Sequence, residues 1–307
     1  MERATLRKLL EKGQIQAPGI FDCISARAVE LVGYKAAYLS SKGISYSWGG
    51  VPDMGLISPD EMMWLAQRVV DYIPMPVIVG LENGYSDNPL VTFRAVERMV
   101  KMGVDSFIID DTTDFRGVDS ERIETADKKI WLSKIKAALS ACEGTECMVI
   151  ARTFAKSTEG LSAAIERCRA AEELGADMTC IEGLKTLDEA KEYAAAVKGL
   201  KMWSDLGVTN GKSDVEPSDI AKLNFLLVTI HYTEKGAMFG MLDFAKENNK
   251  NGNTVYHDTH NYDGMLQGTD YHELFSFHKK WIPMEDRFLD VKDISEKPNV
   301  VQKQGGR

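Results

Sequence analysis

Short apolar runs and amphipathic helical patterns alternate along most of the chain. The clearest run, Val77–Gly80 (VIVG), is rich in β-branched residues, follows Pro74 and Pro76, and stops before the Asn-Gly turn sequence in Glu82–Gly84. Such a run predicts a strand of a parallel sheet that is buried on both faces. Eight strands are predicted in this way, at Gly19–Cys23, Ala37–Gly43, Val77–Gly80, Asp105–Thr112, Cys147–Phe154, Met178–Gly183, Lys201–Gly207 and Phe225–Tyr232.

A helical pattern follows each predicted strand. The clearest start signal is Ser58 as N-cap, with Pro59 in the first helical position and Glu61 completing a capping box. Strict alternation at this count predicts an α/β fold, a (β/α)8 TIM barrel, and a doubly wound open sheet is the less favoured alternative. We predict that residues 1–250 form the barrel and that residues 251–307 form a C-terminal helical extension and tail.

Polar residues stand directly after the apolar runs. They are Ser41, Lys42, Glu82, Asp110, Asp111, Arg152, Glu182, Asp205 and His231. In a parallel barrel the carboxyl ends of all strands meet at one rim, so we expect these side chains to converge there. The polar segment between Thr113 and Ala126 is long for a plain connection, which favours an active-site lid.

Composition narrows the function classes. A formal charge of −9 argues against nucleic acid as a partner, and no stretch approaches the length of a membrane span. The first thirteen residues predict a charged helix without the apolar core of a signal peptide, so we expect a cytoplasmic protein. The cysteines lack the spacing of a zinc site or disulfide framework, and we expect buried thiols at Cys23, Cys142, Cys147, Cys168 and Cys180.

Six motifs carry a resemblance to a known family. They are GIFDCISARAVELVGYKAAYLSSKGIS, VPDMGLIS, VIVGLENGYSD, SFIIDDT, MVIARTF and GADMTCIEGL. Over residues 5–245 the chain resembles the isocitrate lyase and phosphoenolpyruvate mutase superfamily, most closely its short methylisocitrate-lyase-like members. The resemblance implies a TIM barrel, a bound Mg²⁺, and a 2-oxo carboxylate or its enolate as substrate. With the aromatic pattern in residues 270–289, it also implies a homo-oligomer, dimer or tetramer, with C-terminal helices exchanged between subunits.

The resemblance also implies roles for single residues. The metal-associated acids would be Glu82, Asp110 and Asp53, because Mg²⁺ prefers carboxylate and water oxygens. The segment that grips the substrate carboxylate would be Ser41, Lys42 and Gly43. Arg152 would bind the substrate too, since a planar guanidinium matches a carboxylate. We add Tyr85 to the substrate-binding candidates, and the catalytic candidates are Arg152, Glu182, His231 and Arg116.

Two positions depart from the family pattern. Gly80 stands where the family has its first strand-end aspartate, so a direct metal ligand is missing and metal dependence is open. The polar loop also lacks the cysteine of the lyases and the Asn-Ser pair of the mutases. A retro-aldol lyase needs a proton-transferring group on the far side of the breaking bond. The remaining candidates for that group are Glu182, His231, Tyr85 and a loop acid, Asp119 or Glu121.

These features predict a carbon–carbon lyase that acts on a small 2-hydroxy or 2-oxo carboxylate through a metal-stabilised enolate. The first alternative is a C–P mutase or hydrolase on a phosphonopyruvate-like substrate, for which Lys42 and Arg116 are the obvious additional cations. The second is a catalytically lapsed barrel with a binding role. Retention of Glu82, Asp110 and Arg152 favours an enzyme.

Overall fold

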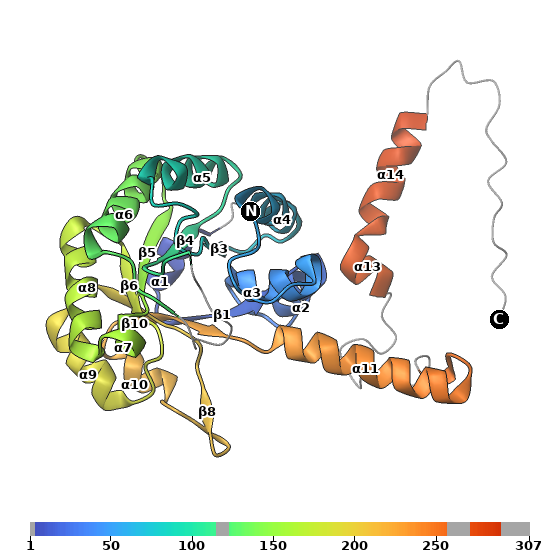
Figure 1. Ribbon diagram of the computed structural model, residues 1–307. Helices are drawn as coiled ribbons and strands as arrows, with labels where there is room; N and C mark the ends of the chain where they lie inside the picture. Colours follow the sequence, from blue (N-terminus) through green and yellow to red (C-terminus); the bar gives the residue numbers. More distant parts are fainter. Residues whose placement is uncertain (1–3, 115–122, 257–270, 290–307) are drawn as a thin grey trace. The chain divides into compact units, whose positions relative to one another are not determined.

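The structure is a computed structural model that describes residues 4–114, 123–256 and 271–289. Parallel strands close into a barrel in the spatial order β1, β10, β7, β6, β5, β4, β3, β2 (Figure 1). The predicted (β/α)8 TIM barrel is therefore confirmed, and the open sheet is excluded. The barrel strands are β1 (Ile15–Ile20), β2 (Ala37–Leu39), β3 (Val77–Gly80), β4 (Ser106–Asp110), β5 (Met148–Thr153), β6 (Met178–Ile181), β7 (Leu200–Trp203) and β10 (Phe225–Ile230).

Helices follow the strands and pack around the outside of the barrel (Figure 1). They are α2 (Cys23–Leu31), α3 (Ser41–Ile44), the π-helix η1 (Ser45–Gly49), α4 (Pro59–Tyr72), α5 (Pro89–Lys101), α6 (Lys128–Cys142), α7 (Ala155–Thr158), α8 (Leu161–Leu174), α9 (Leu187–Ala196) and α10 (Pro217–Ala221). The predicted start of α4 is confirmed, because Ser58 Oγ accepts from the Glu61 N–H and the Glu61 carboxylate accepts from the Ser58 N–H.

Alternation along the strands separates two buried layers. Ile78, Ile108 and Ile150 pack in one cluster, together with Leu6 and Leu10 of α1 (Leu6–Leu10). Their sequence neighbours, such as Val79, Ile109 and Val149, pack in another cluster with residues of α4, α5 and α6. The first cluster therefore fills the barrel and the second lies between strands and helices. Each buried aliphatic side chain contributes roughly 1.5–3 kcal/mol, so both layers hold the strand ends in place.

The second predicted strand was too long. β2 ends at Leu39, and α3 and then η1 follow, so the last part of the predicted strand Ala37–Gly43 is helical. Ser41, Lys42 and Gly43 therefore lie on a short helix that follows the strand. Gly43 is in close contact with other elements, since a Cβ there would lie 2.8 Å from Cβ of Phe21.

The first predicted strand, at Gly19–Cys23, was placed too late. The strand is Ile15–Ile20, and Asp22, which was predicted to lie in the strand, is the N-cap of α2. The Asp22 carboxylate accepts from the Ser25 N–H at 2.7 Å, and Ser25 Oγ accepts from the Asp22 N–H at 3.0 Å. This reciprocal pair is a capping box, so both polar side chains serve the helix start.

A small hairpin, β8 (Val208–Thr209) with β9 (Lys212–Ser213), interrupts the βα unit between β7 and α10 and was not predicted. Its turn, Asn210–Gly211, has positive φ at both residues, which is the backbone that an Asn-Gly hairpin turn requires. The predicted strand Lys201–Gly207 is correspondingly shorter and ends at Trp203.

The described residues divide into two compact units, one ending at Leu242 and the other beginning at Asp243. The helix that leaves the barrel, α11 (Thr233–Asn251), crosses this boundary. The second unit also contains α13 (Tyr271–Ser276) and α14 (His278–Leu289). In the described part of the chain, no helix has the length and hydropathy to cross a membrane.

Candidate active site

A buried ion pair lies inside the barrel mouth. Asp110 ends β4 and stands in register beside Arg152 of β5. Arg152 Nε donates to Asp110 Oδ1 at 2.7 Å, and Nη2 donates to Oδ2 at 2.8 Å. Burial alone would lower the pKa of Arg152, but the charge of Asp110 and its neighbours raises it well above the ordinary value. The guanidinium is therefore a fixed positive charge, held in one orientation by a two-point contact.

Glu182 completes the polar group of this mouth. It follows β6 directly, and its carboxylate accepts from Ser204 Oγ at 2.6 Å and from Arg152 Nη1 at 3.5 Å. The side chain is a quarter exposed, whereas Asp110 is fully buried. Glu182 can therefore exchange a proton with a bound molecule, while Asp110 orients the arginine. The sequence prediction that Asp110, Arg152 and Glu182 converge at one rim agrees with this geometry.

Tyr38 occupies the side of the mouth next to Gly80. The tyrosine is on β2 and is buried, and a Cβ on Gly80 would lie only 2.8 Å from its hydroxyl. The ring of His231 packs edge-on against Tyr38, with 5.7 Å between ring centroids. Sequence reasoning missed Tyr38, because an aromatic residue within an apolar run is typical of a strand in the core.

His231 follows β10 and pairs with a second acid. Its Nδ1 lies 3.2 Å from Asp205 Oδ1. The histidine rests on the backbone of β1, since a Cβ on Gly19 would lie 2.6 Å from His231 Cδ2. Burial raises the pKa of Asp205, but the hydrogen bond and charge of His231 outweigh it and lower the pKa overall. This pair is a second place at the rim where a proton can be held.

The loop after β3 lines a recess of the rim. Glu82 and Tyr85 both have positive φ, and they line a cavity of about 280 Å³ with Asn83 and Asp114. Asn83 ties the loop together, accepting from the Tyr85 N–H at 3.0 Å and donating to Asp114 at 2.7 Å. Tyr85 Oη is buried without a hydrogen-bond partner among the described residues, and burial raises its pKa.

The remaining candidates differ in their burial. Ser41 is buried at the start of α3, while Lys42 beside it is exposed. Asp53 is half-buried in the segment after η1. Arg116 and the loop acids Asp119 and Glu121 lie outside the described residues.

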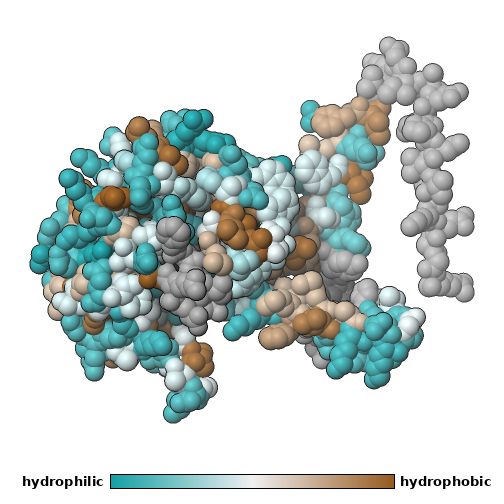
Figure 2. Space-filling model, viewed as in Figure 1, coloured by the Kyte–Doolittle hydropathy of each residue, from teal (hydrophilic) through white to brown (hydrophobic). Residues whose placement is uncertain are grey.

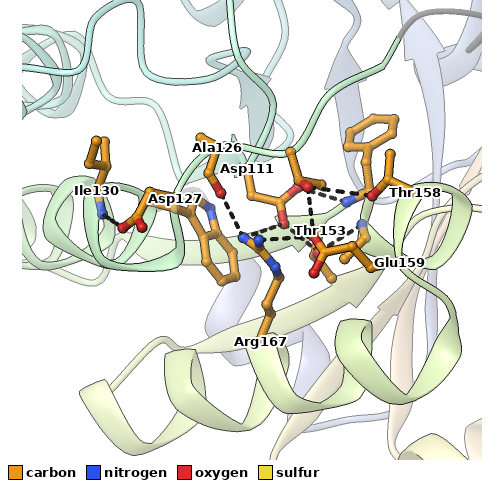
Figure 3. Close-up of polar contacts among 12 residues, drawn as sticks. Asp111, Ala126, Asp127, Ile130, Thr153, Thr158, Glu159 and Arg167 are labelled. Carbon is orange, nitrogen blue, oxygen red and sulfur yellow. Dashed lines mark hydrogen bonds and ion pairs between the residues drawn. The ribbon is translucent and has the colours of Figure 1, made fainter.

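A second buried ion pair lies between the strands and the surrounding helices, and Figure 3 shows its contacts. Asp111 accepts from Thr153 Oγ1 and from the Phe154 N–H, and its Oδ2 lies 3.3 Å from Nη1 of Arg167 on α8. The same arginine nitrogen donates to the Ala126 carbonyl at 3.0 Å. Burial raises the pKa of Asp111 to about 6. This pair holds together the two points where the polar loop leaves and rejoins the barrel.

The family model for phosphoenolpyruvate phosphomutase matches residues 6–239. The chain belongs to this family. A 2,3-dimethylmalate lyase of Eubacterium barkeri is 33% identical over 64% of this chain and 68% of its own length. The petal death protein of Dianthus caryophyllus is 27% identical over 93% of this chain and 89% of its own length. The superfamily membership that the motifs indicated is thus confirmed.

Solved structures agree on the fold. A phosphonopyruvate hydrolase in complex with oxalate and Mg²⁺ matches with a TM-score of 0.79 at 21% identity, and the match covers 92% of this chain and 98% of the other. At this identity the likeness supports the barrel fold alone. That hydrolase holds Mg²⁺ together with oxalate.

The mouth of this barrel does not fit a directly bound Mg²⁺. Both carboxylate oxygens of Asp110 are used by Arg152, and Gly80 has no side chain to offer. Within residues 4–114, 123–256 and 271–289, no three Asp, Glu, His or Cys side chains are grouped as metal ligands. The predicted ligands Glu82, Asp110 and Asp53 are thus not brought together as a set, and their metal role stays a prediction from the resemblance.

Proposed function

We propose that the protein is a carbon–carbon bond lyase that cleaves a small 2-hydroxy or 2-oxo carboxylate through an enolate. The observation that carries this proposal is the Arg152 guanidinium, fixed by Asp110 inside the mouth with Nη1 directed to Glu182. A rigid guanidinium suits a carboxylate and the enolate that develops beside it. Membership of a family that includes 2,3-dimethylmalate lyase supports the same reaction class.

The proposed roles follow from charge and exposure. Arg152 binds the carboxylate end of the substrate and stabilises negative charge as the bond breaks. Glu182 takes or returns a proton, since its carboxylate is partly exposed beside Arg152. His231, which is paired with Asp205, is the second candidate for proton transfer. These roles rest on protein groups, because the mouth does not fit a directly bound Mg²⁺.

The remaining predicted residues keep supporting roles in this proposal. Ser41 and Gly43 are buried in α3 at the end of β2, where backbone and hydroxyl groups can bind a second carboxylate. Tyr85 contributes its hydroxyl from the recess after β3. Lys42 and Arg116 remain predicted contributors, and Arg116 belongs to the polar loop that we expect to close over the substrate.

The alternative is a C–P reaction on a phosphonopyruvate-like substrate, which the likeness to phosphonopyruvate hydrolase keeps open. A phosphonate carries more negative charge than a carboxylate and calls for further cations. Among the described residues of the mouth, Arg152 is a buried cation, whereas Lys42 is exposed. This charge balance favours the carboxylate substrate.

Substrate profiling tests the proposal. We expect the purified protein to cleave at least one hydroxy-diacid or oxo-diacid in a panel, with a 2-oxo acid product detected by NMR. Turnover of phosphonopyruvate but of no diacid would contradict it, and turnover of neither by a protein that binds oxalate would indicate the lapsed barrel. Thiol alkylation should leave activity intact, because four of the five cysteines are buried and Cys23 is half-buried on α2.

We also propose that the protein is a cytoplasmic homo-oligomer, a dimer or a tetramer. Four large apolar side chains are exposed on the part of α11 that belongs to the barrel unit, namely Met238, Phe239, Met241 and Leu242. Figure 2 shows apolar surface along the start of this helix. Such a patch is typical of a subunit contact. Sedimentation showing a monomer at all accessible concentrations would contradict the oligomer.

A further inference from the structure

Gly80 and the Tyr38 side chain are in close contact, so a larger residue at position 80 would meet the tyrosine. Gly80 ends β3 with its open side toward the barrel interior, where a Cβ would lie 2.8 Å from Tyr38 Oη and 3.4 Å from Tyr38 Cε2. An acid at position 80 could not stand there unless the tyrosine moved. Tyr38 is 3% exposed and packs in the interior cluster of the barrel, so its ring has little room to move.

Tyr38 also contacts a polar residue of the mouth, since its ring lies 5.7 Å from that of His231, centroid to centroid. Its hydroxyl lies beside the site of the missing acid, because a Cβ on Gly80 would lie 2.8 Å from Tyr38 Oη. A phenol at this point can donate a hydrogen bond to an oxyanion, which a carboxylate at position 80 could not do without a cation between them.

Arg152 retains donor capacity toward a ligand. Its Nε and Nη2 donate to Asp110 at 2.7 and 2.8 Å, whereas Nη1 makes, among the described residues, a single long contact of 3.5 Å with Glu182. Two N–H groups on Nη1 are more than this one contact needs. The orienting carboxylate and the ligand-binding edge of the guanidinium are therefore on different sides of the same side chain.

We propose that the Arg152 guanidinium and the Tyr38 hydroxyl together bind the substrate's oxyanion in the place beside Gly80, and that the protein binds its 2-oxo carboxylate without a divalent cation. The inference rests on the proposed function and deepens it by naming the groups that stabilise the enolate. Arg152 supplies the positive charge and Tyr38 supplies a second, neutral donor. Both are held by the barrel before the substrate arrives, so little reorganisation is needed.

Calorimetric titration of oxalate, a mimic of a planar 2-oxo carboxylate enolate, tests the proposal on the full chain. We expect wild-type protein in excess EDTA and wild-type protein in excess Mg²⁺ to bind oxalate with dissociation constants within about threefold of each other. Oxalate binding that requires Mg²⁺ would overturn this inference and leave the proposed function standing. No oxalate binding in either buffer would overturn the proposed function, and the inference with it.

A substitution tests the role of the Tyr38 hydroxyl separately from that of Arg152. Tyr38→Phe keeps the ring that packs in the barrel, and we expect it to weaken oxalate binding in EDTA by about tenfold, the usual effect of losing one hydrogen bond to an anion. Tyr193→Phe is the matched control, because that buried hydroxyl donates to Thr179 away from the mouth. Equal oxalate affinity in Tyr38→Phe and wild type, with both folded by circular dichroism, would overturn the role of Tyr38.

A double substitution tests whether the Tyr38 hydroxyl takes the place of an acid at position 80. In Tyr38→Phe/Gly80→Asp the hydroxyl is removed and the family's acid is restored. We expect Mg²⁺ to strengthen oxalate binding to this variant by about tenfold or more, while it leaves wild type unchanged. If Mg²⁺ strengthens oxalate binding to the wild type as much as to the double variant, the proposal is wrong.

Discussion

Asp110 and Asp111 are neighbours in the chain, and each binds an arginine, yet the two pairs lie on opposite sides of the barrel wall. Asp110 points into the mouth and holds Arg152 with two short hydrogen bonds. Asp111 points outward and meets Arg167 of α8 at 3.3 Å, with Thr153 and the Phe154 N–H as further donors. The alternation of side chains along β4 produces this difference.

The comparison shows that a buried Asp–Arg pair does not by itself indicate a catalytic site. The outer pair is saturated by protein groups, since Arg167 also donates to the Ala126 carbonyl and to Glu159. The inner arginine keeps an edge directed at the mouth. We therefore assign ligand binding to the inner pair and support of the polar loop to the outer one.

The sharpest way to break this assignment is to replace each arginine with lysine. Arg152→Lys keeps the charge but loses the two-point geometry, so we expect kcat/KM to fall by about a thousandfold, equivalent to about 4 kcal/mol. Arg167→Lys is the matched change in the outer pair and should leave oxalate affinity within about threefold of wild type. Equal loss of oxalate binding in both variants would show that the pairs are not functionally distinct.

The outer pair is tested through stability. Arg167→Met leaves the Asp111 carboxylate buried without its cation, and we expect it to lower the free energy of unfolding in urea by about 3 kcal/mol. Adding Asp111→Asn removes the uncompensated charge and should recover part of that loss. If the single variant unfolds at the same urea concentration as wild type, Arg167 does not stabilise the buried acid.

A third change concerns Glu182, which contacts the inner pair. Glu182→Gln keeps the size of the side chain but removes the proton-accepting carboxylate, so we expect kcat to fall by about a hundredfold with a smaller change in KM. Ser204→Ala, which removes the hydrogen-bond partner of Glu182, should cost no more than about tenfold. Unchanged kcat in Glu182→Gln would assign the proton transfer to another group, with His231 the next candidate.

A buried cation away from both pairs provides the smallest expected effect. Lys201 on β7 donates to the Gly199 carbonyl at 2.7 Å and lies 5.9 Å from the ring centroids of Tyr193 and Phe225. Burial lowers its pKa to about 8. The pKa of Lys201 is lower in the folded protein than in the unfolded chain, so between pH 8 and pH 10 the unfolded chain binds more protons at this residue than the folded protein does. The stability contribution of Lys201 therefore increases as the pH rises through this range.

We expect wild type to gain roughly 1 kcal/mol relative to Lys201→Met between pH 7 and pH 10, a value reduced for partial screening by solvent. Urea denaturation at several pH values measures this difference. Parallel stability curves for the two proteins would show that the pKa of Lys201 is the same in the folded and unfolded states.

The barrel itself could be predicted because periodicity fixes it. Eight apolar runs that alternate with helical patterns leave few other arrangements, and strand ends such as Asp110, Arg152 and Glu182 then share one rim. The start of α4 was predictable for a similar reason, since the capping signal from Ser58 to Glu61 is entirely local. Errors arose where local signals conflict, as at β1, which contains Pro18 and was placed too late.

The pairing of groups in the mouth could not be predicted, because it depends on register and on contacts between distant residues. Nothing local distinguishes Asp110, which faces inward, from Asp111, which faces outward. Tyr38 has the composition of a core residue, and its closeness to Gly80 exists only once β2 and β3 pair. The contact between Asp111 and Arg167 likewise requires α8 to be packed against the barrel.

A crystal structure of the protein grown with both oxalate and Mg²⁺ tests the central claim most directly. We expect oxalate in the barrel mouth with oxygens about 2.7–3.1 Å from Arg152 Nη1 and Tyr38 Oη, and the Asp110–Arg152 pair intact. A Mg²⁺ ion between oxalate and the carboxylates of Glu82 and Asp110, with Asp110 released from Arg152, would contradict the account.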